Sequence, residues 1–288
     1  MISTAAAVGI LLLAHGGDPA WNAQVENLRA AVSSSVPAAL ALGMADPDAL
    51  QAGVDALEKA GVSRIVAVPL FVNSNSEVME QTRYSLGLSD KPSEVLREAA
   101  ERMKSMPMPP GMPHHRMNMF SLKRVRHSSG VGIILAPALD ADPFVSSVLL
   151  ERATALSLQP GKETVVLVAH GPVDAAAIAD WERDLSIHAR AIVKGGFRAA
   201  QAALLRDDAA PEVRAKAVAE LRAKVEAAGR DGGKALVVPV LIARGGIEDK
   251  IPRDLAGLPF AWSGDALLPH AGFDRWVLKR AQDAVAHR

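Results

Sequence analysis

The chain reads VGILLLAHG from Val8 to Gly16 and VVLVAHG from Val165 to Gly171. Each stretch is a continuous apolar run that stops at a His-Gly pair and gives way to a helical pattern. Runs of this kind are typical of strands buried on both faces of a parallel sheet. His15 and His170 are therefore expected at the carboxyl ends of two such strands, where open α/β folds bind their ligands. The repeated phrase also indicates an internal duplication.

Composition excludes several classes of protein. Hydrophobic residues make up 49% of the 288, enough for two cores of ordinary size. Lys plus Arg equals Asp plus Glu at 32 each, so no overall field favours nucleic acid or a membrane surface as a partner. The absence of cysteine excludes disulfides, a cysteine nucleophile and thiolate metal sites. Any metal ligands must come from His, carboxylate or Met side chains.

The apolar run from Ala5 to Ala14 has about half the length that a membrane helix needs. No Lys or Arg precedes it, so it lacks the basic region of a signal peptide. We interpret the run as a buried first strand and expect a cytoplasmic protein. A cleaved signal peptide is the alternative interpretation.

Apolar runs alternate with helical periodicity along the whole chain, which favours two parallel sheets covered by helices. The predicted strands are 8–14, 38–44, 64–72, 131–136, 164–169, 199–205, 235–242 and 258–262. The predicted helices are 21–32, 48–60, 80–86, 144–155, 175–193, 211–228 and 273–285.

Two further pairs of similar segments support duplication. VPLFV at 68–72 resembles VPVLI at 238–242, and VLLERA at 148–153 resembles WVLKRA at 276–281. These repeated segments occur in the same order in both halves, which predicts an N-terminal lobe over 1–157 and a more divergent C-terminal lobe over 162–288. Pro160 and Gly161 lie in the predicted linker.

The segment 103–127 breaks the alternating pattern. It holds six of the nine methionines, three of the eight histidines, four prolines and no acidic residue. Prolines forbid a regular helix or central strand, so a long basic loop is expected. Three interpretations stay open: a metal-collecting tail, a passive disordered segment, or a lid that contacts acidic groups. The basic residues available to such a lid are Lys104, Arg116, Lys123, Arg124 and Arg126.

Three motifs of the first lobe resemble class II chelatases of the CbiX type. They are LLLAHGG at 11–17, VPLFV at 68–72 followed by a small polar turn, and APALD at 136–140 leading through Pro143 into a helix. The second half follows the same plan more loosely, as in the long fused members of that family.

The resemblance implies two similar α/β lobes and a lyase that inserts a divalent metal into sirohydrochlorin or a related tetrapyrrole with eight carboxylates. This reaction belongs to cobalamin and siroheme biosynthesis. The metal is a substrate, with Co²⁺ favoured and Fe²⁺ or Ni²⁺ as alternatives, and no organic cofactor is expected. Two fused lobes suit a monomer with pseudo-two-fold symmetry, and a homodimer is the alternative.

In the family the histidine after the first strand is an active-site residue, so that role carries over to His15. A second active-site histidine normally follows the Pro-Leu-Phe strand, whereas this chain has Asn73-Ser-Asn-Ser-Glu77 there. Depending on register, Asn75 or Glu77 takes its place. Imidazole and carboxylate both suit such metals and both accept protons, so His15 and Glu77 are the predicted catalytic pair and metal ligands.

Other residues complete the predicted site. Gly16, Gly17 and Asn75 are expected to lie against the tetrapyrrole, and Arg83 to meet one of its carboxylates. His170 is a further candidate metal ligand, or else a structural relic of the duplication. His188 shares a helical face with Trp181 and Leu185 and is expected to pack in the core. Two rival functions stay open: a non-catalytic metal or tetrapyrrole carrier, and an enzyme of different chemistry on the same lobes.

Overall fold

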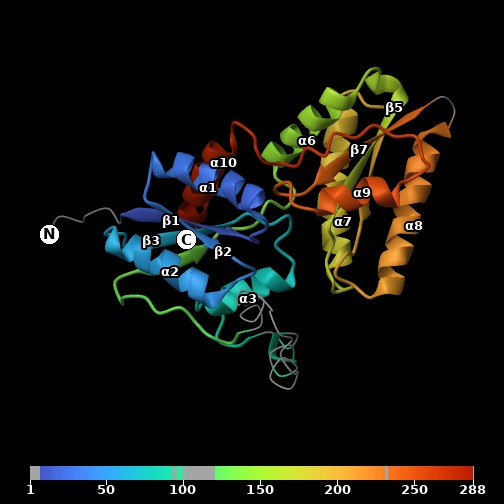
Figure 1. The fold of residues 1–288 in the computed structure, drawn as a ribbon. Coiled ribbons are helices and arrows are strands. Elements are labelled where there is room, and N and C mark those ends of the chain that lie inside the picture. The colour runs from blue at the N-terminus through green and yellow to red at the C-terminus, as the bar shows by residue number, and fades with distance from the viewer. Residues whose placement is uncertain are drawn as a thin grey trace. The chain divides into compact units, whose positions relative to one another are not determined.

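The structure is a computed structural model that describes residues 7–92, 94, 96–98, 101, 121–230 and 233–287. The chain divides into two compact units (Figure 1). The first unit comprises Met1–Ala138 together with Ala271–Arg288, and the second unit comprises Leu139–His270. Both are α/β units built on parallel sheets, as the alternating sequence pattern predicts.

The first unit contains a sheet in the order β2-β1-β3-β4. Its strands are β1 (Val8–Ala14), β2 (Ala38–Leu42), β3 (Arg64–Pro69) and β4 (Gly132–Leu135). The strands run in parallel, with Leu13 opposite Pro69 between β1 and β3. All carboxyl ends therefore lie at one edge of the sheet.

Helices cover both faces of this sheet (Figure 1). They are α1 (Pro19–Ser33), α2 (Pro47–Lys59), α3 (Glu77–Ser85) and α10 (Phe273–Ala286). Leu11 and Leu13 face a core with α2 and α3, whereas α1 and α10 lie on the opposite face. Asp18 starts α1 by accepting the backbone N–H of Trp21, and Asp46 starts α2 by accepting that of Asp48.

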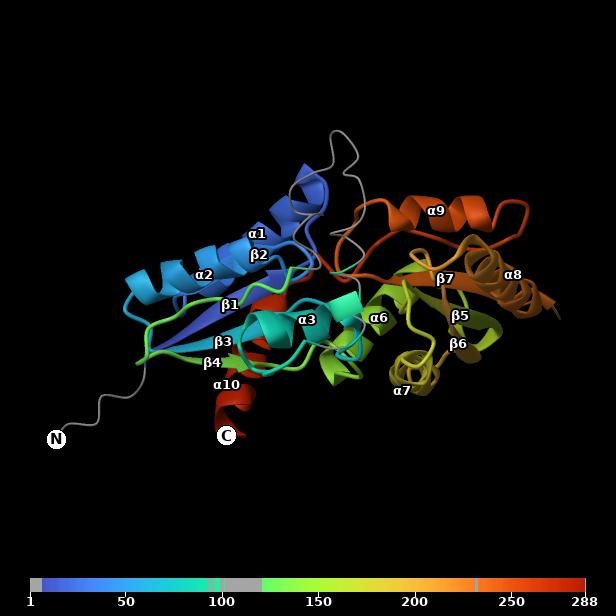
Figure 2. The same ribbon diagram turned by 90° about the horizontal axis from the view of Figure 1, so that it is seen from below.

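The second unit repeats the plan around a sheet in the order β6-β5-β7 (Figure 2). Its strands are β5 (Glu163–Ala169), β6 (Ala199–Leu204) and β7 (Lys234–Val240). Its helices are α6 (Pro143–Leu156), α7 (Ile178–Lys194), α8 (Pro211–Ala228) and α9 (Ile247–Asp254), with a 3₁₀ turn at Pro160–Lys162. Figure 2 shows α8 and α9 on one face of the sheet and α6 and α7 on the other.

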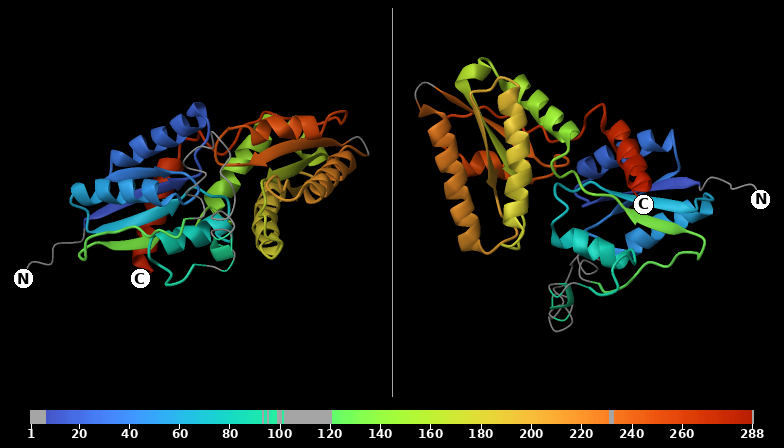
Figure 3. Two further views of the ribbon diagram at one scale, coloured as in Figure 1. Left: turned by 60° about the horizontal axis from the view of Figure 1, so that its bottom comes forward. Right: turned by 180° about the vertical axis from the view of Figure 1, so that it is seen from behind.

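The two units exchange their last helices. Helix α6 ends the first half of the sequence but packs beside α7 and β7 in the second unit. Helix α10 ends the second half but packs beside α1 and β3 in the first unit, as both views of Figure 3 show. The compact units therefore differ from the predicted lobes 1–157 and 162–288. The sequence pattern predicts which helices are apolar on one face but not which sheet each one covers.

Two predicted details are corrected. The stretch 258–262 is no full strand: it forms one bridge, in which Ala261 hydrogen-bonds to Ala235 and Val237. Pro259 has no N–H to extend the ladder. Helix α9 was missed, because Gly245-Gly246 before it and Pro252 inside it are typical of loops. The other predicted elements are present, with ends shifted by a few residues.

Candidate functional site

His15 is the first residue after β1, at the carboxyl edge of the first sheet. Its side chain is exposed, and Nδ1 lies 2.6 Å from the carbonyl oxygen of Gly16. A carbonyl oxygen only accepts, so Nδ1 carries the proton and Nε2 of the neutral ring keeps its lone pair. Within the part of the chain that the structure describes, Nε2 makes no hydrogen bond. His15 thus offers a nitrogen suited to a transition metal or a proton.

The polar turn after β3 lies at the same edge. Strands β1 and β3 are neighbours, and Leu70 N–H donates to the carbonyl of Leu13 just before His15. Within the turn, buried Asn73 accepts the backbone N–H of Asn75 at 2.8 Å. Ser74 Oγ accepts the N–H of Ala138 at 2.9 Å, which ties the turn to the segment after β4.

Glu77 is the first residue of α3 and is half-buried, whereas Asn75 is exposed in the turn. A carboxylate at this position is favoured by the positive end of the helix dipole. The segments that carry His15 and Glu77 thus leave two neighbouring parallel strands at the same edge of the sheet. Arg83 is exposed in the last turn of α3.

The two glycines after His15 have different structural reasons. Gly16 has φ +80°, a left-handed conformation that glycine adopts without strain. Gly17 has no room for a side chain, since a Cβ there would lie 2.9 Å from the ring of Trp21. Packing against Trp21 is thus sufficient to explain Gly17.

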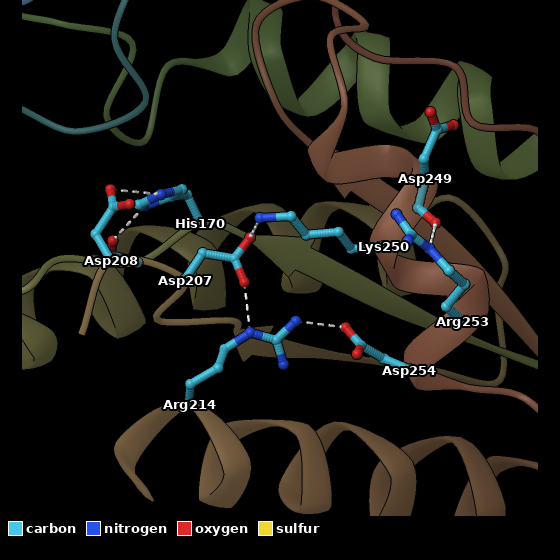
Figure 4. Close-up of polar contacts among 9 residues, drawn as sticks. His170, Asp207, Asp208, Arg214, Asp249, Lys250, Arg253 and Asp254 are labelled. Carbon is cyan, nitrogen blue, oxygen red and sulfur yellow. Dashed lines mark hydrogen bonds and ion pairs between the residues drawn. The ribbon is translucent and has the colours of Figure 1, made fainter. Parts of the chain in front are cut away.

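His170 occupies the equivalent place after β5 (Figure 4). Its Nδ1 lies 2.7 Å from the carbonyl oxygen of Gly171, which has φ +79°, so the local geometry of His15 is repeated. Unlike His15, its Nε2 is occupied, 3.1 Å from Oδ2 of Asp208. Burial favours the neutral ring, but the hydrogen bonds to Asp208 and Gly171 outweigh it and raise the pKa of His170.

A network of ion pairs lies beside this histidine (Figure 4). Arg214 bonds to Asp207 and, at 2.6 Å, to Asp254, and Lys250 reaches Asp207 at 3.3 Å. Burial opposes the charge of Arg214, yet its two carboxylate partners raise its pKa. These ion pairs between acidic and basic side chains connect α8, α9 and the loop after β6. His170 is an ion-pair partner in this setting.

Asp208 is a residue that sequence reasoning missed. The doublet Asp207-Asp208 lies just beyond β6, after Leu205 and Arg206. Carboxylates shortly after a predicted strand were the available signal. In the first unit the carboxylate after β2 is Asp46, which caps α2 through the N–H groups of Asp48 and Ala49.

The basic segment 103–127 is described only from Ser121 onward. Lys123 pairs with Asp48 at 3.2 Å. Arg124 lies 5.3 Å from the centre of the Tyr84 ring and donates to the carbonyls of Tyr84 and Ser89. These two cations bind the protein itself, which disfavours them as lid residues. The predicted contributions of Lys104 and Arg116 lie outside the described residues.

Two features are absent from the described part of the chain. No group of three or more His, Asp or Glu side chains there is arranged to hold a metal ion. Nor does that part contain a helix long and apolar enough to cross a membrane. Two candidate ligands, rather than a closed cage, are what the first sheet edge offers.

Solved structures with the same fold cover nearly the whole chain. SirB from Bacillus subtilis with Fe³⁺ is 17% identical with a TM-score of 0.62, over 97% of this chain and 96% of that one. The sirohydrochlorin chelatase SirB from Bacillus subtilis subspecies spizizenii with cobalt is 13% identical with a TM-score of 0.58, over 97% and 95%. CbiX, described as the terminal enzyme of siroheme biosynthesis in denitrifying bacteria, is 19% identical with a TM-score of 0.55, over 96% and 99%.

These identities establish the fold alone, and no curated protein sequence matches the chain significantly. A family sequence model is more specific. The model described as CbiX matches residues 9–156, just over half of the chain, and the match includes both His15 and Glu77. This protein belongs to the CbiX family.

Proposed function

We propose that the protein is a chelatase that inserts a divalent metal into sirohydrochlorin or a related tetrapyrrole. Membership of the CbiX family supports this class of reaction, and the solved relatives are structures with Fe³⁺ and with cobalt. The single observation that carries the proposal is the exposed His15, whose protonated Nδ1 leaves a ligating Nε2 at the carboxyl edge of the sheet. Co²⁺ is the metal we favour, with Fe²⁺ and Ni²⁺ as alternatives.

The reaction exchanges two pyrrole protons for one metal ion. His15 Nε2 holds the incoming metal weakly and accepts one pyrrole proton as the metal leaves it. The Glu77 carboxylate, delivered to the same edge, accepts the other proton. Asn75 cannot accept a proton at neutral pH, so we assign it to substrate contact along with Gly16 and Gly17. Exposed Arg83 offers a bidentate partner for a substrate carboxylate.

His170 is left out of the proposed metal site. Its Nε2 faces Oδ2 of Asp208 at 3.1 Å, and an acceptor at that distance favours a proton on this nitrogen over a metal ion. We propose that the second unit does not hold a second metal site. We further propose a monomer in the cytoplasm, with a homodimer as the alternative.

The proposal is tested by anaerobic Co²⁺ insertion into excess sirohydrochlorin, followed by absorbance. We expect many equivalents of product per protein. Glu77→Gln should lower kcat about 100-fold, because a general base typically contributes at least that factor. Glu80→Gln, one turn further on and exposed, is the matched control and should behave as the wild type.

The rival function is a carrier of metal or tetrapyrrole that evolved from a chelatase. A carrier converts at most one equivalent and then stops. Product formation that stops at one equivalent per protein would therefore contradict the enzyme and support the carrier. Turnover that survives Glu77→Gln unchanged would remove Glu77 from the mechanism.

A further inference from the structure

A pair of hydrogen bonds joins α1 to the loop after His15. The backbone N–H of Gly17 donates to Oδ1 of Asn22 at 2.9 Å, and Nδ2 of Asn22 donates to the carbonyl of Gly17 at 3.1 Å. One amide side chain therefore satisfies both backbone groups of a single residue. The start of α1 sets this up, because Asp18 caps the helix and Asn22 N–H donates to the Asp18 carbonyl one turn later.

The contact reaches His15 through one peptide group. The carbonyl of Gly16 and the N–H of Gly17 belong to the same planar, trans unit and point in opposite directions. Its N–H is held by Asn22 and its carbonyl accepts Nδ1–H of His15 at 2.6 Å. Fixing one end of the plane fixes the other, although Gly16, with φ +80°, has no side chain to restrict rotation.

The orientation of that carbonyl decides which ring nitrogen of His15 carries the proton. A carbonyl aimed at Nδ1 requires a proton there, and the neutral ring then keeps its lone pair on Nε2. If the peptide turned, Nδ1 would lose its acceptor and the proton would be free to move to Nε2. An imidazole protonated at Nε2 would present no lone pair at its exposed end.

We propose that Asn22 is a positioning residue of the metal-insertion site: by holding the Gly16–Gly17 peptide, it keeps His15 protonated at Nδ1 and leaves Nε2 free for the metal or a pyrrole proton. The catalytic part of this inference rests on the proposed function. The tautomer part does not, because it follows from the hydrogen bonds alone.

In the second unit a different contact fixes the histidine after the first strand. Gly171 is followed by Pro172, which has no N–H for a side chain to hold. There Nε2 is fixed by Asp208, and Arg206 donates to the carbonyl of Val173 at 2.8 Å. A charged partner thus fixes His170 and occupies the nitrogen that stays free in His15. The uncharged contact between Asn22 and Gly17 leaves Nε2 of His15 unoccupied, so this arrangement is compatible with a histidine that binds a metal.

The experiment is ¹⁵N NMR of the full chain labelled on histidine, at about pH 8.5, where an ordinary imidazole is neutral. A spectrum of His15→Gln assigns the His15 signals. We expect the wild type to show protonated Nδ1 and bare Nε2. Asn22→Ala should shift a large fraction to the Nε2–H form. Asn22→Asp retains an acceptor for Gly17 N–H and should retain the wild-type tautomer.

Two further variants serve as a control and as a second test of the same contact. Asn27→Ala changes an exposed asparagine on the same helix and should leave the tautomer untouched. Asn22→Leu fills similar space without either hydrogen bond and gives the same test if the alanine variant loses structure. A wild-type tautomer in both Asn22→Ala and Asn22→Leu would overturn the proposal.

Kinetics complete the test. Loss of a residue that orients a metal ligand typically costs 10–100-fold in activity, so kcat should fall by about that factor in Asn22→Ala and recover in Asn22→Asp. A tautomer shift with unchanged kcat would refute the role in catalysis. A wild type without any turnover would refute the proposed function, and the NMR result would still decide what Asn22 does to His15.

Discussion

Three histidines of this chain differ in what their nitrogens contact. His15 is exposed and ligates through Nε2 in our proposal, whereas His170 is paired with Asp208. His188 is buried: Nδ1 lies 2.7 Å from Ser146 Oγ and Nε2 lies 2.9 Å from the carbonyl oxygen of Asp140. His188 therefore packs in the core, as its helical spacing predicts, and ties α7 to the start of α6.

The two paired histidines couple stability to pH with opposite signs. The pKa of His170 is raised, so its contribution is present below the unfolded value and is lost as pH rises through the folded one. The pKa of His188 is lowered, mainly by burial, although the Asp140 carbonyl and the nearby Asp184 and Asp142 oppose that effect. Its contribution is lost as pH falls below about 6.5, the ordinary value for histidine.

His188→Gln tests this linkage, since glutamine offers a donor and an acceptor but does not titrate. At neutral pH the variant should lose about 1–3 kcal/mol of unfolding free energy from imperfect hydrogen bonds. As pH falls from about 7.5 to 5, the wild type should lose stability more steeply than the variant. Urea unfolding across that range is the measurement, and parallel curves for the two proteins would contradict the assignment.

At the scale of elements, the sequence was most informative where a strand is buried on both faces. β1 and β5 are such strands, and their apolar runs predicted both the strands and the histidines after them. Prediction failed where local and tertiary signals disagree. Helix α9 contains Pro252, yet buried Ile251 and Leu255 anchor it on the second sheet. Packing against neighbouring elements outweighs local propensity there.

Within the candidate site, sequence predicted the residue types better than their partners. His15 and Glu77 are candidates because each follows a strand that carries a recognisable motif, and their roles stay predictions. The sequence did not indicate Asp208 or the hydrogen bonds between Asn22 and Gly17. Both contacts depend on how a loop folds back on a helix or a neighbouring strand. Hydrogen bonds of this kind leave no periodic signal in the chain.

At the scale of the molecule, the exchange of α6 and α10 makes each unit depend on the other half of the sequence. Val277 on α10 is fully buried in the first unit, and Val148 on α6 is fully buried in the second. Neither half of the chain contains all the helices that cover its own sheet. Folding of one unit therefore requires residues from both halves.

Val277→Ala and Val148→Ala form a matched pair that tests the exchange. Each removes two buried methyl groups and should cost about 2 kcal/mol. Hydrogen exchange should quicken in β1 and β3 for Val277→Ala, and in β5 and β7 for Val148→Ala. The reverse assignment, with Val277→Ala loosening the second sheet, would mean that the terminal helices cover the sheets of their own halves.

The central claim is that one histidine of the duplicated pair performs the chemistry. Anaerobic Co²⁺ insertion into sirohydrochlorin by His15→Ala and His170→Ala, side by side with the wild type, tests it most directly. We predict a loss of at least about 100-fold for His15→Ala, as for removal of a proton acceptor, and a rate close to wild type for His170→Ala. Wild-type turnover by His15→Ala, or an equal loss in both variants, would contradict the account.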